Sequence, residues 1–221
     1  MRVLKVLSIL SKKIVSLITA RGGSKGIPGK NIIDIKGKPL IQYTINSSLK
    51  SKVNETWVST DCDHISSISK TLGAKIINRP KELCDDIIMP DAALIHFAKN
   101  IEFDILVFIQ PTSPLLSSEY INKGLNMLET YDSVFSAYKE HWLPRWTLDN
   151  KPYKWDINKR PRRQDKQELY VENGAFYITT KKNLLSSNLR YSGNVGIVEM
   201  PLSKSYQLDS KDDLDILKKL L

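Results

Sequence analysis

Cysteine and histidine are scarce in this sequence, and their scarcity argues against a cysteine–histidine metal site and against a fold held together by disulfides. The 221 residues include two cysteines, Cys62 and Cys84, whose spacing matches no metal-binding motif, and three scattered histidines. With no export signal, two cysteines also argue against a disulfide-stapled fold. No run of about 18 apolar residues is present, so the sequence predicts no membrane-spanning helix.

The segment 1–13 is basic and partly apolar but lacks the organisation of a signal peptide. Lys5, Lys12 and Lys13 interrupt its apolar stretches, and no small-residue cleavage site follows. We therefore expect a short N-terminal extension on a cytoplasmic protein.

Two common phosphate-binding motifs are missing as well. The P-loop pattern fails because Ser24 and Asn31 stand at its first and last defined positions. The dinucleotide fingerprint fails because Ser24 stands where a second glycine must follow Gly22. A different loop is present at residues 20–31, where Arg21, Lys25 and Lys30 lie among four glycines. Because glycine lets backbone N–H groups approach an anion closely, this loop predicts a polyphosphate site.

Apolar runs alternate with helical periodicity along most of the chain. Strands are predicted at Ile14–Thr19, Glu55–Ser59, Ala74–Asn78, Ile105–Gln110, Ser133–Ala137, Ala175–Thr179 and Val195–Met200. Helices are predicted at Pro39–Leu49, Asp63–Leu72, Pro90–Ile101, Ser118–Thr130 and Lys211–Leu220. The alternation predicts a single α/β domain, a three-layer sandwich around a mostly parallel, Rossmann-like sheet.

Polar motifs follow three of the predicted strands. They are Arg21–Asn31, Ser59–Asp61 and Gln110–Pro114. Ligands of parallel α/β sheets bind beyond the carboxyl ends of the strands, so these motifs predict one shared site.

The stretch 138–167 interrupts the alternation. It contains Trp142, Trp146, Trp155 and a basic run at 159–163. We interpret it as an insertion that leaves the sheet and packs its aromatic residues at an interface. The net charge of +9 is spread along the chain without a nucleic-acid-binding signature, and it suits an enzyme with anionic substrates.

Five segments together resemble the CMP-sialic acid synthetases, or acylneuraminate cytidylyltransferases. The segments are Ala20–Asn31, Val58–Asp61, Arg79–Leu83, Gln110–Leu115 and Asn173–Tyr177. The resemblance implies transfer of CMP from CTP to the anomeric hydroxyl of a nine-carbon α-keto acid sugar, such as sialic, legionaminic or pseudaminic acid, with release of pyrophosphate. It also implies Mg²⁺ as cofactor, a homodimer built through the insertion, and a product destined for surface glycans.

The resemblance also assigns roles to individual residues. Nucleotide binding falls to Arg21, Gly22, Ser24, Lys25, Lys30, Asn31 and Arg79. Sugar binding falls to Gln110, Thr112, Ser113, Arg163, Asn173 and Tyr177. Arg21, Lys30 and Asp209 would act in catalysis, and Asp209 would also hold the metal.

The chain departs from the family pattern at two positions. Gln207 replaces the first aspartate of a late Asp-x-Asp pair, and Leu116 replaces an arginine. Asp212 and Asp213 fit the start of the last helix better than a metal site. Two alternatives stay open on the sequence: a nucleotidyltransferase for another sugar or nucleotide, and a non-catalytic nucleotide-binding protein.

Overall fold

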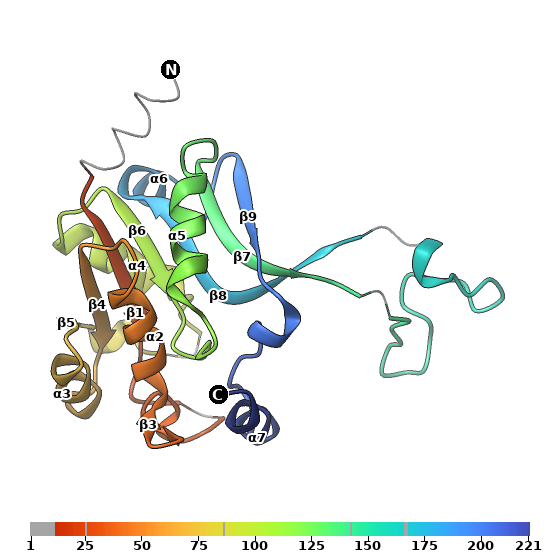
Figure 1. Ribbon diagram of the computed structural model, residues 1–221, viewed down its shortest axis with the longest axis horizontal. Coiled ribbons are helices and arrows are strands. Elements are labelled where there is room, and N and C mark those ends of the chain that lie inside the picture. Colours follow the sequence, from red (N-terminus) through yellow and green to blue (C-terminus); the bar gives the residue numbers. More distant parts are fainter. Residues whose placement is uncertain (1–11, 25, 86, 142, 166–167) are drawn as a thin grey trace.

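A seven-stranded sheet forms the centre of the protein (Figure 1). The computed structural model describes residues 12–24, 26–85, 87–141, 143–165 and 168–221. The strands are β1 (Ile14–Thr19), β4 (Glu55–Thr60), β5 (Lys75–Asn78), β6 (Ile105–Ile109), β7 (Ser133–Lys139), β8 (Tyr170–Thr180) and β9 (Val195–Glu199), in the spatial order β5-β4-β1-β6-β8-β7-β9. Only β8 runs antiparallel to its neighbours. The predicted mostly parallel sheet is therefore confirmed.

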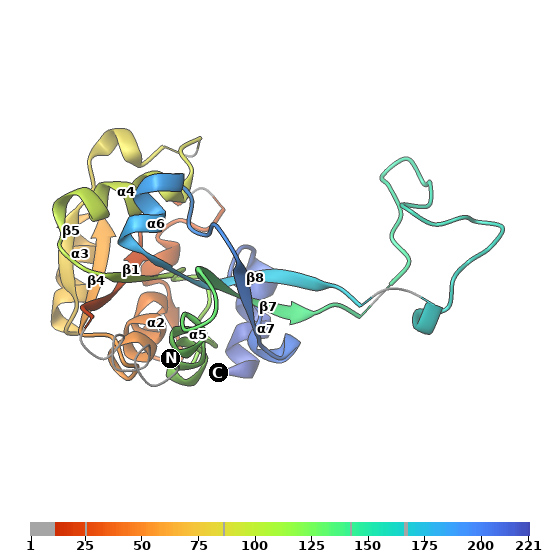
Figure 2. The ribbon, with the colours of Figure 1, turned by 90° about the horizontal axis from the view of Figure 1, so that it is seen from above.

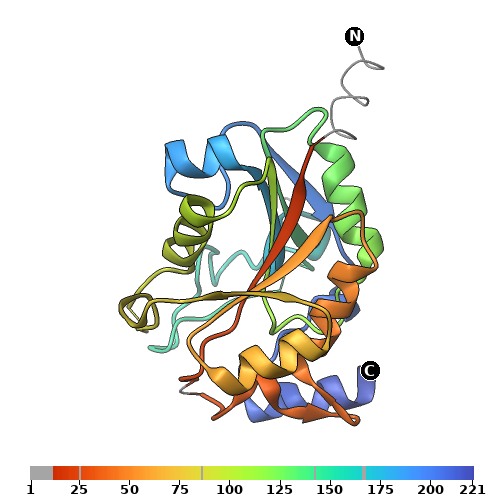
Figure 3. The same ribbon diagram turned by 90° about the vertical axis from the view of Figure 1, so that its left-hand side faces the viewer.

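Helices cover both faces of this sheet and complete the three layers (Figure 3). The helices are α2 (Leu40–Leu49), α3 (Asp63–Thr71), α4 (Pro90–Asn100), α5 (Ser118–Met127), α6 (Lys181–Ser187) and α7 (Lys211–Leu220). Side chains of α2, α3 and α5 share one buried cluster with the sheet, and those of α4 and α6 share another. A third cluster joins α7 to the short β2–β3 hairpin, Asp34–Ile35 and Lys38–Pro39.

The two central strands show why this sequence makes three layers. In β1, Ile14 and Ile18 pack in the α2–α3–α5 cluster, whereas Val15 and Leu17 pack in the α4–α6 cluster. Successive strand residues point to opposite faces, so a strand covered on both faces needs a nearly continuous apolar run. The one polar residue in the middle of β1, Ser16, is buried and hydrogen-bonds Ser48. The same pattern holds for β6, whose residues are all buried.

Several elements differ from the sequence prediction: the β2–β3 hairpin was not predicted, β7 is longer than predicted, and α5 ends at Met127 rather than Thr130. Helix α6 was not predicted, because Lys181–Ser187 shows no apolar period, yet Thr180 caps it by accepting a hydrogen bond from the Asn183 N–H at 3.1 Å. Strand β8 begins at Tyr170 rather than Ala175, because it pairs with β7 beyond the predicted apolar core.

Between β7 and β8 the chain leaves the sheet, and we call residues 140–169 the arm. The arm projects far from the three layers (Figures 1 and 2). Within it the Trp146 and Trp155 rings pack edge to face with centroids 5.0 Å apart, while Leu143, Leu148 and Ile157 are exposed. Trp142 lies outside the described residues. In the ranges that the structure covers, no helix has the length and apolar character to cross a bilayer.

Gly124 tests the packing of α5 on the sheet. A Cβ at this position would lie 2.7 Å from Ile178 Cδ1 and 2.9 Å from Phe176 Cε2. We expect Gly124→Ala to lower the free energy of unfolding by about 1–2 kcal/mol, because overpacking outweighs the helix propensity of alanine. Urea unfolding measures the change, with exposed Lys123→Ala as the control. A Gly124→Ala variant as stable as the parent would contradict this packing.

Candidate active site

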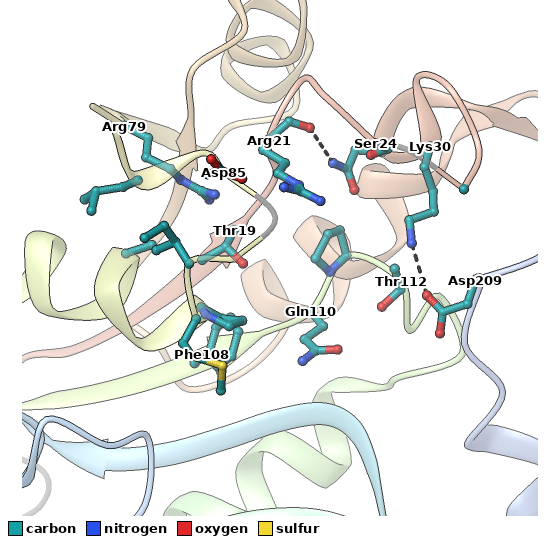
Figure 4. A pocket seen from close by; sticks show the side chains of 18 residues that line it. Thr19, Arg21, Ser24, Lys30, Arg79, Asp85, Phe108, Gln110, Thr112 and Asp209 are labelled. Atoms are coloured by element: carbon teal, nitrogen blue, oxygen red, sulfur yellow. Dashed lines mark hydrogen bonds and ion pairs between the residues drawn. The ribbon is translucent and has the colours of Figure 1, made fainter. Parts of the chain in front are cut away.

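A cavity of about 400 Å³ lies at the carboxyl ends of β1 and β6, beside the end of β4 (Figure 4). Parallel pairing aligns the ends of these strands, since Thr19 is in register with Ser59 and Ile18 with Ile109. The loops that follow therefore meet at one place. Eight predicted site residues line the cavity: Arg21, Ser24, Lys30, Asn31, Arg79, Gln110, Thr112 and Asp209. Lys25 lies outside the described residues.

The glycine-rich loop is held in place by two hydrogen bonds from its ends. Gly22 N–H donates to Asp61 Oδ1 at 2.8 Å, and Asn31 Nδ2 donates to the Arg21 carbonyl at 2.9 Å. Gly29 adopts a left-handed conformation, with φ of 66°, directly before the short helix Lys30–Ile32. These contacts preorganise the loop around the cavity.

Three basic side chains converge on the cavity, Arg21 and Lys30 from the glycine-rich loop and Arg79 from the segment after β5. Arg21 Nη1 donates to the Cys84 carbonyl at 3.0 Å. Arg79 is only 8% exposed and donates through Nε and Nη2 to the hydroxyl and carbonyl of Ser59. Burial lowers the pKa of Arg79, but a guanidinium remains protonated in proteins. Lys30 contributes the third cation, so the cavity suits an anion.

Asp209 is the predicted metal ligand that lines the cavity. Its side chain is 66% exposed, and its Oδ1 accepts a hydrogen bond from Lys30 Nζ at 3.1 Å. Asp213 instead caps α7 in a reciprocal pair with Ser210, as the sequence indicated. Among the described residues, no three histidine, cysteine or acidic side chains gather into a metal site. One carboxylate with substrate phosphate oxygens still fits Mg²⁺, which often keeps several waters.

Two predicted sugar-binding residues, Ser113 and Asn173, are buried and do not line the cavity. The two residues are only 2% and 5% exposed. Asn173 Oδ1 accepts from Ser136 Oγ at 2.6 Å, and Asn173 Nδ2 donates to Ser205 Oγ at 2.9 Å. The Asn173 amide therefore helps to join β8 to β7 and to the segment after β9, and its predicted contact with sugar stays a prediction.

Tyr177 stands on β8 in the α4–α6 cluster. Its hydroxyl donates to Glu172 Oε2 at 2.9 Å, and its ring stacks on Phe108, a residue of the cavity wall, with centroids 5.7 Å apart. Burial, together with the Glu172 charge, raises the pKa of Tyr177, so its hydroxyl keeps its proton at neutral pH.

Arg163 is the predicted sugar ligand that lies farthest from the cavity, because it stands in the projecting arm. It lies in the arm, in the short helix Arg163–Asp165, and contacts the His141 ring. The arm extends away from the sheet (Figure 2), so the fold of one chain leaves this arginine apart from the other site residues.

Sequence reasoning missed part of the cavity wall. Asp85 and Met89 line the cavity from the loop before α4, where no motif marked them. Phe108 was recognised only as a residue of a buried strand. Cys84 lies beside Asp61, and its pKa is raised by burial and by that charge, so its thiol is a poor nucleophile.

Comparison with protein families and curated proteins gives a consistent picture. Residues 15–220 match the family described as Cytidylyltransferase. The chain is 38% identical to N-acylneuraminate cytidylyltransferase B of Danio rerio over 204 residues, which cover 88% of this chain and 48% of that protein. It is 30% identical to pseudaminic acid cytidylyltransferase of Campylobacter jejuni over 220 residues, covering 93% and 95%. The chain thus spans about half the length of the N-acylneuraminate cytidylyltransferases that it matches.

Solved structures share the fold. CMP:2-keto-3-deoxy-manno-octonic acid synthetase complexed with CTP superposes with a TM-score of 0.72 at 21% identity, covering 94% of this chain and 98% of that one. A 4-diphosphocytidyl-2C-methyl-D-erythritol synthase from Anaerococcus prevotii gives 0.71 at 15% identity, covering 96% and 97%. The matches together confirm the resemblance that the five sequence segments indicated.

Asn31 tests how the glycine-rich loop is held. Asn31→Ala removes the bond to the Arg21 carbonyl, and we expect it to lower the free energy of unfolding by about 1 kcal/mol. Hydrogen exchange should become faster at residues 21–24 and stay unchanged in β7 and β9. Asn46→Ala, on α2, is the comparison variant. Unchanged exchange in the loop would show that Asn31 does not hold it.

Proposed function

This chain belongs to the cytidylyltransferase family, and on that premise we propose that it transfers CMP from CTP to a nine-carbon α-keto acid sugar. The convergence of Arg21, Lys30 and Arg79 on one cavity is the observation that carries the proposal. A nucleoside triphosphate such as CTP bears about four negative charges, and cations held in place by backbone contacts can bind it without rearranging.

In the proposed reaction the basic side chains of the cavity offset the negative charges of the two substrates. The sugar's anomeric hydroxyl attacks the α-phosphate of CTP and gives up its proton to water, the bond from the α-phosphorus to the bridging oxygen breaks, and pyrophosphate leaves with that oxygen. Arg21 and Lys30 offset the repulsion between the two anionic substrates and stabilise the charge that develops on pyrophosphate. Gln110 and Thr112, on the loop after β6, line the part of the cavity assigned to the sugar.

Mg²⁺ is part of the proposal. Asp209 would hold the ion together with phosphate oxygens of CTP, since Mg²⁺ is commonly bound through one or two carboxylates and substrate phosphates. When bound, the ion would offset phosphate charge as a Lewis acid. Lys30 contacts the same carboxylate, so this lysine lies next to the residue that would hold the ion.

The sugar class is a nonulosonic acid such as sialic, legionaminic or pseudaminic acid. The match to a pseudaminic acid cytidylyltransferase extends over nearly the full length of both chains, which supports this class. Leu116 is 3% exposed and packs in the α2–α3–α5 cluster, so position 116 offers no charge to a sugar carboxylate. The product would serve surface glycan assembly, and the reaction would take place in the cytoplasm.

A homodimer completes the proposal. The arm exposes Leu148 and Ile157, at 105% and 60%, and none of its described residues belongs to a buried apolar cluster. Large apolar side chains on a projecting segment mark an interaction surface. Because the arm carries Arg163 away from its own cavity, a sugar contact by this residue needs a second chain.

The proposed activity is tested by incubating the full chain with CTP, Mg²⁺ and a panel of nonulosonic acids. Mass spectrometry should detect a CMP-sugar and pyrophosphate for at least one acid. A strong preference for UTP or GTP would move the activity to another nucleotide. CTP binding without turnover of any acid would favour the non-catalytic alternative.

The arm surface is tested by light scattering after size-exclusion chromatography. The parent chain should have twice the mass of one chain, and the double variant Leu148→Asp with Ile157→Asp should have the mass of one chain. Leu189→Asp, exposed on the body near α6, should leave the dimer intact. A parent chain that is already monomeric would refute the dimer.

A further inference from the structure

We propose that Gln207 is a positioning residue that fixes the sugar end of the cavity and is not a ligand of the metal ion. The inference rests on the proposed function, because it assigns the sugar to the neighbourhood of Gln110. Gln207 is the residue that replaces the first aspartate of the Asp-x-Asp pair in the family pattern.

The carboxamide of Gln207 joins three segments of the chain. Its Nε2 lies 3.3 Å from Ser113 Oγ and 3.4 Å from Gln110 Oε1, and it also donates to the Asn173 carbonyl. One backbone bond supports this junction, since Leu208 N–H donates to the Thr112 carbonyl at 2.9 Å. The loop after β6, the start of β8 and the segment before α7 therefore meet at one amide.

Gly174 makes room for that amide. A Cβ at this position would overlap Gln207 Nε2 and would lie 3.0 Å from Gln110 Oε1. Its φ of 66° is also a conformation that side-chain-bearing residues rarely adopt. The bare backbone at Gly174 lets Gln207 approach the Asn173 carbonyl directly.

The surroundings of Gln207 require a donor. The Asn173 backbone carbonyl can only accept, and a carboxylate offers acceptors only. A glutamate side chain of the same length would face this oxygen without a hydrogen to share. Gln207 Nε2 contacts the side-chain oxygen of Gln110 and so orients the Gln110 carboxamide on the cavity wall.

A consequence for the metal follows. Asp209 is then the one carboxylate that the 205–209 segment offers to the cavity, and CTP supplies the remaining ligands. We expect the ion to bind with the nucleotide and to be insensitive to the Gln207 side chain.

Steady-state kinetics test the positioning role. Gln207→Leu and Gln207→Glu should each raise the KM for the sugar about tenfold, the effect of losing one well-placed hydrogen bond, and change the KM for CTP less than about threefold. Gln42→Leu, on α2, is the matched control and should change neither constant. An unchanged KM for the sugar, or equal increases in both constants, would overturn the proposal.

Electron paramagnetic resonance of Mn²⁺ separates positioning from ligation. In the presence of CTP, Gln207→Leu should bind Mn²⁺ within about twofold of the parent, because no ligand is lost. A loss of about tenfold or more would identify Gln207 as a metal ligand and overturn the proposal.

A double-mutant cycle separates this inference from the proposed function. The melting-temperature shifts of Gln207→Leu and Gln110→Leu should sum to more than the shift of the double variant, because both remove one shared contact. Additive shifts would overturn the contact even in an active enzyme. A parent chain inactive toward every sugar would instead overturn the proposed function, and with it the sugar role of Gln207, whereas the cycle would still report the contact.

Discussion

The parallel register of β4, β1 and β6 is the constraint on which the cavity depends. Thr19 pairs with Ser59, and Ile18 pairs with Ile109, so the three strands end level with one another. The glycine-rich loop, the Asp61 turn and the Gln110 loop then start from one edge of the sheet. A one-residue register shift would turn every side chain of a strand to the opposite face, so Ile14 and Ile18 would exchange clusters with Val15 and Leu17 and the close packing of both clusters would be lost. Packing in the core therefore fixes where the polar loops meet.

The cations at this edge are positioned by the fold before any ligand arrives. Arg79 donates to Ser59, and Arg21 donates to the Cys84 carbonyl. Asn31 closes the glycine-rich loop by donating to the Arg21 carbonyl. Preorganised charges need little rearrangement when an anion binds. The pair between Lys30 and Asp209 is different, because the Asp209 side chain is largely exposed. Such a pair contributes at most about 1 kcal/mol, so a phosphate can take the place of the carboxylate at Lys30.

Much of this arrangement could be predicted from the sequence, because its causes are local. Apolar runs identified the central strands. Two of the three polar motifs after them, Arg21–Asn31 and Gln110–Pro114, supply residues to the cavity wall, whereas Ser59–Asp61 holds Gly22 and Arg79 in place. Other features depend on contacts between distant segments. Asn173 was predicted from a motif, yet its amide bonds Ser136 and Ser205, partners that only the folded sheet brings near. Asp85 carried no motif. The break in the alternation at 138–167 did predict that the chain leaves the sheet there, and the arm between β7 and β8 does so. The capping of α6 by Thr180 also escaped a reading based on apolar periods.

The central claim is that cations of the glycine-rich loop hold a nucleoside triphosphate at the carboxyl edge of the sheet. Calorimetric titration of CTP tests it most directly. Lys30→Ala should weaken CTP binding about 10- to 100-fold, the effect of losing a charge-assisted hydrogen bond, and should leave the weak binding of cytidine unchanged. Lys38→Ala, an exposed lysine outside the cavity, serves as the control and should bind CTP like the parent. A Lys30→Ala variant that binds CTP with the affinity of the parent would contradict the account.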